Sequence, residues 1–298
     1  MRSQKRKELE GRLGAWFFRR IQRWVEKKDA LQAEKAGAKL GRFIYRVSKK
    51  HRNRALANLE LAMPELSIQE RERIAKGVFE HFGMVGTDFM RTMKRSDQEV
   101  IDSITMEGFE HVESALALGK GVLVITGHFG NWERLGQYAR AKGFTMHVVA
   151  RDANDSKMNQ IMMDLRGHAG LNVLPRGNAA RQMLGLLKDN QLVAVLPDQN
   201  SSETFVPFFG KPCGTVQGPA VLHLRTGAPL LPSFCARVGP GKYRLMIKPH
   251  IQPEPGFDGP EAYTRAINNA IEEVIREYPE QWLWLHDRWK SARRAGLL

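Results

Sequence analysis

Cysteine is scarce in this sequence, and long apolar runs are absent from it. The only cysteines, Cys213 and Cys235, lack the spacing of a disulfide framework or a zinc site, so we expect both to stay reduced. No apolar run approaches the roughly 18–20 residues that a membrane-spanning helix needs. The basic N-terminus also lacks the unbroken apolar core of a signal peptide. We therefore expect a chain that is neither exported nor threaded through a bilayer.

Acidic residues are scarce at the N-terminal end, which makes the charge distribution uneven. Residues 1–60 contain 18 Lys and Arg but only 6 Asp and Glu, and they carry most of the net charge of +14. The rest of the chain is nearly neutral, and a hydrophobic content of 42% suffices for a sizeable core. A basic end of this kind binds phosphates, either in nucleic acid or on the anionic face of a membrane.

The basic end contains an amphipathic helical pattern over residues 9–26. Aliphatic residues and the aromatic residues Trp16, Phe17 and Trp24 recur there at helical steps beside a basic face. Rings at headgroup depth and cations on lipid phosphates are typical of an interfacial helix. The alternative is a surface helix that packs its apolar stripe on the domain.

Helical patterns continue to about residue 105. A helix is expected over 31–47, with its longer apolar side chains directed inward: Leu40, Phe43, Ile44 and Val47. Ser67 and Glu70 have the spacing of a capping box, which predicts that another helix starts there. We therefore expect residues 1–105 to form a basic, helical, membrane-docking region packed on the core.

From residue 106 the pattern changes to alternating strands and helices. Strands are expected at 121–126, 145–150, 171–174, 192–196, 229–238 and 242–249, and helices near 132–142, 155–168, 178–189 and 260–277. Strands that alternate with helices at this spacing are parallel strands joined by crossover helices. The predicted fold of residues 106–298 is α/β, with a central, mostly parallel sheet flanked by helices and preceded by the N-terminal helical region.

Polar side chains follow three of these strands at their carboxyl ends, where open α/β sheets bind ligands. The three clusters are His128 to Glu133 after the first strand, Arg151 and Asp152 after the second, and Asp198 and Gln199 after the strand that ends at 196. Their convergence predicts a site at this edge of the sheet.

His128 is the candidate general base, although a lone histidine can also be a structural residue. With His128 in a glycine-framed turn and Glu133 in the first turn of a helix, the carboxylate could hold one imidazole nitrogen and leave the other as a base. The backbone N–H groups after Gly127 could stabilise an oxyanion. The alternative for Glu133 is a first-turn carboxylate favoured by the helix dipole.

No protein nucleophile accompanies this base. The sequence has no G-x-S-x-G elbow, and neither cysteine has a neighbouring histidine in the sequence. The glycines of GHFGNWE match neither a dinucleotide-binding fingerprint nor a P-loop. A base without a nucleophile indicates direct attack by a deprotonated group of the substrate.

Several segments, in order, resemble the lipid A late acyltransferases of the lysophospholipid acyltransferase superfamily, over roughly residues 40–290. They include GHFGNWE, LVAVLPDQN, VPFFGKPCGTVQGP and YPEQWLWLHDRWK. The resemblance implies an O-acyltransferase that moves a fatty acyl chain from acyl carrier protein or acyl-CoA to a glycolipid hydroxyl. It implies no metal and no redox cofactor.

The resemblance also implies roles for individual residues. His128 becomes the general base and Glu133 its partner in an H-x-x-x-x-E motif. The predicted substrate-binding residues are Arg151, Asp198, Asn131 and Thr215, and Phe209 and Gly210 are expected near the acyl or acceptor pocket. We expect Arg166 to be a charged surface residue, and the alternative is that it binds phosphate.

The N-terminus departs from the family pattern, because many members carry a hydrophobic anchor where this chain has an amphipathic helix. The acceptor could therefore also be another membrane glycolipid, such as a phosphatidylinositol mannoside. We expect a peripheral protein on the cytoplasmic face of the inner membrane, with an anionic membrane surface, the acyl donor and the glycolipid as partners. The alternatives are a membrane scaffold without activity or a nucleic-acid-binding protein. Nucleic acid is not expected, because the aromatic residues share a stripe with Leu and Ile.

Overall fold

Helices open the chain, as the sequence predicts. They are α1 (Arg2–Glu26), α2 (Ala30–Val47), α3 (Lys49–Ala62) and α4 (Ile68–Met90), followed by the short η1 (Thr92–Lys94) and α5 (Asp97–Asp102). The structure, a computed structural model, describes residues 2–150, 156–175, 177 and 179–298. The predicted capping box at α4 is confirmed: the Ser67 N–H donates to Glu70 Oε2 (2.8 Å), and the Glu70 N–H donates to Ser67 Oγ (3.3 Å).

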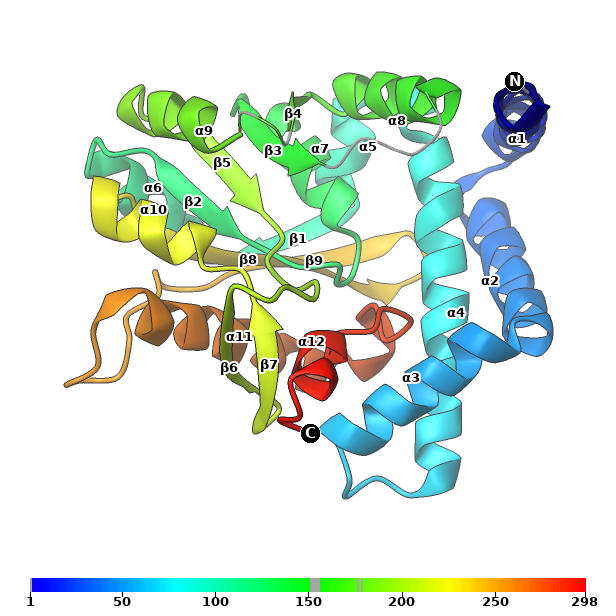
Figure 1. Cartoon of the computed structure of the whole chain (residues 1–298). Coiled ribbons are helices and arrows are strands. Elements are labelled where there is room, and N and C mark those ends of the chain that lie inside the picture. Colours follow the sequence, from blue (N-terminus) through cyan, green and yellow to red (C-terminus); the bar gives the residue numbers. More distant parts are fainter. Residues whose placement is uncertain (1, 151–155, 176, 178) are drawn as a thin grey trace.

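A seven-stranded sheet forms the centre of the molecule (Figure 1), in the order β1-β9-β8-β2-β5-β3-β4. Its strands are β1 (Ile104–Glu107), β2 (Val122–Ile125), β3 (Met146–Ala150), β4 (Leu171–Pro175), β5 (Leu192–Val195), β8 (Leu230–Gly239) and β9 (Lys242–Ile247). The β8–β9 pair is antiparallel and the other neighbouring pairs are parallel. The predicted α/β fold with a mostly parallel central sheet is therefore confirmed.

Helices cover both faces of the sheet, which is why its central strands are continuous apolar runs. All four residues of β2 are buried, and they alternate between the two faces. Leu123 and Ile125 join a core with α3, α4, α11 (Gly259–Glu277) and the C-terminal tryptophans, whereas Val122 and Val124 join a second core with α6 (Phe109–Ala117) and α7 (Trp132–Ala141). The remaining helices are α8 (Ser156–His168), α9 (Ala179–Lys188), α10 (Gly218–Thr226), η3 (Pro279–Gln281) and α12 (Lys290–Arg294).

Several elements lie outside the sequence-based prediction. Strand β1 spans the boundary placed at residue 105 and pairs with β9, so residues on both sides of that boundary share the sheet. The segment that contains Phe209 and Gly210 forms a separate antiparallel hairpin of β6 (Thr204–Phe208) and β7 (Lys211–Thr215). Helix α10 follows this hairpin.

Helix α2 packs with the face opposite to the predicted one. The side chains expected to point inward are exposed, with Phe43 and Val47 each 60% accessible. Small residues face α4 instead, because a Cβ on Gly37 would lie 2.4 Å from the Gly83 carbonyl oxygen, and one on Gly41 would lie 2.0 Å from that of Phe79. The close approach of two helix backbones therefore overrides the apolar periodicity. None of the helices formed by the described residues is long and apolar enough to cross a membrane.

Candidate active site

The turn between β2 and α7 places His128 at the carboxyl edge of the sheet. Asn131 caps α7, since its side-chain oxygen accepts from the Arg134 N–H at 3.2 Å. Gly130 has a positive φ of 55°, and a Cβ there would lie 2.0 Å from the Cys235 carbonyl oxygen. The tight turn and the close approach to β8 explain why glycine precedes the cap.

Asp198 holds His128 from the neighbouring strand. It follows β5, which pairs with β2, so the two residues meet at the same edge of the sheet. The imidazole Nδ1 lies 2.8 Å from Asp198 Oδ1, and the backbone N–H of His128 donates to Asp198 Oδ2 at 2.7 Å. The indole N–H of Trp282 also donates to Oδ2, at 2.9 Å. Asp198 therefore fixes both the ring and the backbone of the candidate base.

Each group of this pair shifts the pKa of the other. Burial alone disfavours ionised Asp198, but the charge and hydrogen bonds of His128 and the bond from Trp282 lower its pKa to about 2. Burial also disfavours charged His128, yet the carboxylates of Asp198 and Glu133 outweigh it and raise the pKa of His128 above 6.5. An ionised Asp198 accepts from the Nδ1–H, which leaves the lone pair of neutral His128 on Nε2.

Glu133 does not hold the imidazole, so that prediction is wrong. Its Oε1 accepts from Arg166 Nη2 at 2.9 Å, from Arg166 Nε at 3.2 Å and from the indole of Trp132 at 3.2 Å. Helix α7 begins at Trp132, and its first turn directs Glu133 toward α8 rather than back toward the ring. Glu133 acts on His128 through its charge.

The other predicted site residues occupy different surroundings. Asn131 is only 1% exposed, and its amide donates to Asp88 at 2.8 Å while its oxygen caps α7, so it organises the turn. Thr215 is fully buried and accepts from Arg288 Nη2 at 2.8 Å, within the packing between β7 and the C-terminal segment. Arg151 lies outside the described residues.

Backbone N–H groups of the turn are mostly engaged within the protein, contrary to the expectation of an open oxyanion site there. The His128 N–H donates to Asp198, the Gly130 N–H to the Gln281 carbonyl at 2.8 Å, and the Asn131 N–H to the Cys235 carbonyl at 2.7 Å. These bonds make the turn rigid but leave few donors for a developing negative charge.

The C-terminal segment 282–291 supports the site in a way that sequence reasoning missed. Besides the bond from Trp282, His286 Nε2 accepts from the Asn200 N–H at 2.9 Å, and the fully buried Arg288 donates to the Gln199 carbonyl at 3.3 Å. The sequence shows only an aromatic-rich stretch, whose periodicity indicates packing and contains no signal for contacts with residues 198–200.

Helix α4 supports the turn from the other side. His81 is 2% exposed, and its Nε2 lies 3.0 Å from the Gly130 carbonyl oxygen. Burial, the largest influence, lowers the pKa of His81 to about 4, so it is neutral at physiological pH and donates through Nε2. Asp88 binds Arg134 through two bonds of 2.9 and 3.0 Å, which ties α4 to α7.

Gly130→Ala is expected to destabilise the protein by about 2–4 kcal/mol, since a positive φ costs a residue with a Cβ about 1 kcal/mol and the clash adds more. Gly119→Ala is the matched control, because Gly119 has a φ of 65° but open space around its Cβ position. Urea unfolding of both variants is the measurement. Equal losses of stability would show that contact with the Cys235 carbonyl contributes nothing.

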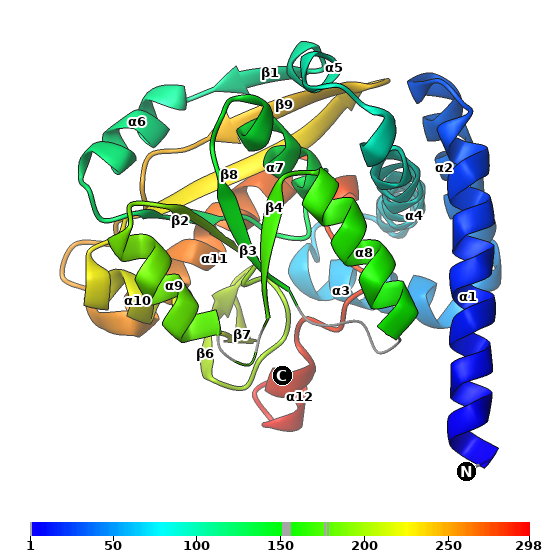
Figure 2. The ribbon, with the colours of Figure 1, turned by 90° about the horizontal axis from the view of Figure 1, so that it is seen from above.

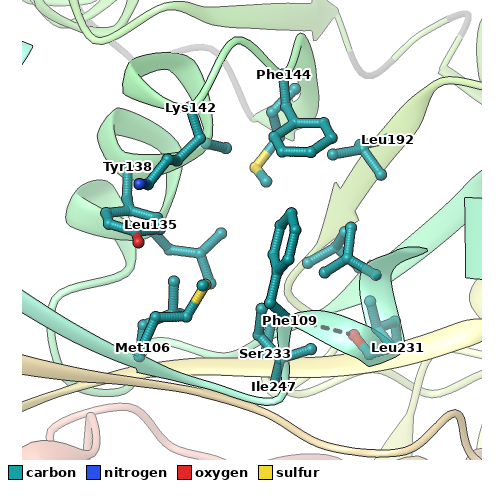
Figure 3. A pocket seen from close by; sticks show the side chains of 15 residues that line it. Met106, Phe109, Leu135, Tyr138, Lys142, Phe144, Leu192, Leu231, Ser233 and Ile247 are labelled. Carbon is teal, nitrogen blue, oxygen red and sulfur yellow. Dashed lines mark hydrogen bonds between the residues drawn. The ribbon is translucent and has the colours of Figure 1, made fainter. Parts of the chain in front are cut away.

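An apolar cavity of about 50 Å³ lies between α6, α7 and the sheet (Figure 3), with Phe109, Leu135, Tyr138 and Leu231 in its wall. Cavities of about 150 Å³ hold a benzene-sized molecule, so this one cannot take a fatty acyl chain without opening. Its lining contains neither His128 nor Asp198. Within the part of the chain that the structure describes, no three His, Cys, Asp or Glu side chains are placed to hold a metal ion.

Comparisons with known proteins show the family to which the chain belongs. The family described as bacterial lipid A biosynthesis acyltransferase matches residues 5–291. The Escherichia coli lipid A biosynthesis palmitoleoyltransferase is 29% identical over 263 residues, which cover 86% of this chain and 84% of that protein. The lauroyltransferase of the same organism is 30% identical over 266 residues, with coverage of 86% and 84%. A phosphatidylinositol mannoside acyltransferase of Mycobacterium tuberculosis is 30% identical over 200 residues, with coverage of 64% and 62%. The chain belongs to the bacterial lipid A biosynthesis acyltransferase family, and it is an acyltransferase.

Proposed function

We propose that this acyltransferase moves a fatty acyl chain from a thioester, acyl carrier protein or acyl-CoA, to a hydroxyl of a membrane glycolipid, with His128 as the general base. The observation that carries the proposal is the pairing of His128 Nδ1 with buried, ionised Asp198. This pairing directs the lone pair of Nε2 away from the carboxylate, where a hydroxyl proton can be taken up.

The reaction needs no protein nucleophile. His128 Nε2 takes the proton of the acceptor hydroxyl while its oxygen attacks the thioester carbonyl carbon. The tetrahedral intermediate then breaks the C–S bond, and the leaving thiolate takes the proton back from Nε2. Asp198 stabilises the imidazolium that exists between these two transfers.

Arg166 offers a contact for the acceptor. Its guanidinium binds the buried Glu133, and its side chain is 24% exposed, so Arg166 is in part accessible to a ligand. A guanidinium in this position binds phosphate or other anionic groups well. Glu133 then serves mainly to orient Arg166, and this contact favours a phosphorylated glycolipid.

The names of the relatives indicate two possible classes of acceptor, a lipid A precursor and a phosphatidylinositol mannoside. Mass spectrometry of lipids from cells with and without the gene distinguishes them, because the added mass reports the acyl chain and the acceptor together. We expect a glycolipid species that lacks one acyl chain in the deletion strain and returns on complementation. Identical glycolipid spectra in both strains would contradict the proposal.

The exposed apolar side chains of α1 and α2 support peripheral docking on the cytoplasmic face of the inner membrane. Trp16, Phe17 and Trp24 of α1 are 52–61% exposed, and the exposed large apolar residues of α2 are 39–60% exposed. Arg20 lies over the ring of Trp16 and Lys28 over that of Trp24, so cations and rings share one surface. Figures 1 and 2 show both helices on one side of the molecule. Such a surface suits anionic lipid headgroups.

Replacing Trp16, Phe17 and Trp24 by Ser is expected to weaken binding to phosphatidylglycerol-containing vesicles by about tenfold or more. Vesicle sedimentation measures the affinity of each variant for the vesicles. The control is Val221→Ser with Leu224→Ser, exposed apolar residues of α10 on the opposite side of the molecule (Figure 2). Equal binding by both variants, or tight binding to DNA without binding to vesicles at matched salt, would contradict membrane docking.

A further inference from the structure

Gln199 lies against the nitrogen that takes the proton. Its side-chain Nε2 is 3.3 Å from His128 Nε2. Because ionised Asp198 accepts from Nδ1–H, the ring of neutral His128 presents a lone pair at Nε2, and only a donor can face it. The amide nitrogen of Gln199, rather than its oxygen, therefore points to the base.

The residues around Gln199 fix its backbone beside His128. Its backbone carbonyl accepts from Arg288, and the following Asn200 bonds through its N–H to His286. The side chain of Asn200 also donates to Ser291 Oγ at 2.8 Å and accepts from the Ser291 N–H at 2.8 Å. A donor on such a fixed loop needs little reorganisation during a reaction, which is the property that makes oxyanion stabilisation effective.

Gln199 also supplies what the turn lacks. The N–H groups of His128, Gly130 and Asn131 are bonded to protein acceptors. Acyl transfer creates negative charge on the former carbonyl oxygen, within a few ångströms of the base that takes the hydroxyl proton. The amide of Gln199 is a donor beside this base with a second N–H available in addition to the one that faces the ring.

We propose that Gln199 is a catalytic residue whose side-chain amide donates to the oxyanion of the tetrahedral intermediate; this rests on the proposed acyl transfer. When the acceptor oxygen bonds to the thioester carbon, its proton passes to His128 Nε2 and the carbonyl π electrons move to oxygen. For this transfer the acceptor hydroxyl first displaces the amide N–H of Gln199 from the lone pair of Nε2. The displaced N–H then donates to the oxyanion, because protonated Nε2 can no longer accept a hydrogen bond. Collapse of the intermediate breaks the C–S bond, the thiolate leaves with the proton of Nε2, and the amide returns to the ring.

The test compares Gln199→Ala and Gln199→Glu with wild type. Both are expected to lower kcat by about 10²–10³-fold with little change in the KM of the acyl donor. The reason is that the hydrogen bond from Gln199 to the oxyanion forms only after the hydroxyl has attacked the thioester. Gln191→Ala is the matched control, since Gln191 lies at the opposite end of β5 and its side chain bonds to the Asp189 carbonyl, away from His128. The control is expected to keep wild-type kcat.

Two acyl-donor analogues separate a catalytic role from a structural one. A trifluoromethyl ketone analogue, whose carbonyl adds water to give a tetrahedral hydrate, should lose affinity for Gln199→Ala by about the same factor as kcat/KM. A thioether analogue without the carbonyl should bind both proteins equally. Equal losses for the two analogues, or a kcat within threefold of wild type, would overturn the assignment of Gln199. If His128→Ala also retains full transfer, the proposed function fails as well; if His128→Ala is inactive, only the role of Gln199 fails.

Discussion

Replacing Asp198 by Asn is expected to lower kcat for acyl transfer by about 10³–10⁴-fold while the protein stays folded. The reason is geometric. Asp198 Oδ2 accepts from two donors, the His128 backbone N–H and the Trp282 indole. The oxygen of an asparagine must therefore occupy that position, which turns its NH₂ group toward His128 Nδ1. Nδ1 then has to accept, Nε2 carries the proton, and the base is in the wrong tautomer.

The imidazole nitrogen chemical shifts of ¹⁵N-labelled protein report this tautomer directly. Asp198→Asn is expected to move the proton of neutral His128 from Nδ1 to Nε2. Glu133→Gln is the matched control, because Glu133 binds Arg166 and Trp132 and should leave the tautomer unchanged. A tautomer change in Glu133→Gln but none in Asp198→Asn would restore Glu133 as the partner of the imidazole.

The same pair determines the pH dependence of the wild-type enzyme. Only neutral His128 can accept a proton, and its pKa is raised above 6.5. Activity therefore falls as the pH drops through this raised pKa, and the acid limb of kcat/KM lies above pH 6.5. Loss of the carboxylate in Asp198→Asn removes the main influence that raises the pKa, so the acid limb of its residual activity should move to lower pH.

Asp88→Ala is expected to destabilise the fold by about 3–5 kcal/mol, since it leaves buried guanidinium groups without a counter-charge. Asp88 binds Arg134 through two bonds and Arg95 through another, and the side chains of these arginines are only 3% and 6% exposed. Burial opposes ionisation of Asp88, but the two arginines and Asn131 lower its pKa to about 2. The stabilisation is therefore present above pH 3.8 and is lost as the pH falls toward 2.

Guanidinium chloride unfolding measures this loss of stability. Asp97→Ala is the matched control, because Asp97 pairs with Arg140 in a bridge whose side chains are 49% and 36% exposed. Exposed pairs contribute about 0–1 kcal/mol, so the control should remain within about 1 kcal/mol of wild type. Similar losses of stability in both variants would show that the buried ion pairs of Asp88 stabilise the fold no more than the exposed pair of Asp97.

Several features of this fold follow from local sequence patterns. The sequence segments that form β2 and β5 are continuous apolar runs, because helices cover both faces of the sheet. Such runs can be recognised in the sequence alone. His128 and Asp198 each follow one of these strands, so their place at the carboxyl edge was predictable. Ser67 and Glu70 mark the start of α4 by chemistry confined to four residues.

Contacts between distant segments could not be predicted in this way. Glu133 is five positions from His128 and Asp198 is seventy, but the pairing of Ile125 with Val195 across β2 and β5 brings Asp198 to the ring. The outward turn of Phe43 depends on how closely α2 approaches α4, which periodicity does not encode. The bond from Trp282 to Asp198 joins residues 84 positions apart and left no local signal.

Acyl transfer by purified protein tests the proposed function most directly. The assay follows transfer of a radiolabelled acyl chain from acyl carrier protein and from acyl-CoA to glycolipids extracted from the deletion strain. Wild-type protein is expected to label a glycolipid, and His128→Ala, folded as judged by its circular dichroism and thermal unfolding, is expected to lose about 10³-fold or more of the rate. Transfer at the wild-type rate by folded His128→Ala would contradict the assignment of His128 as the base.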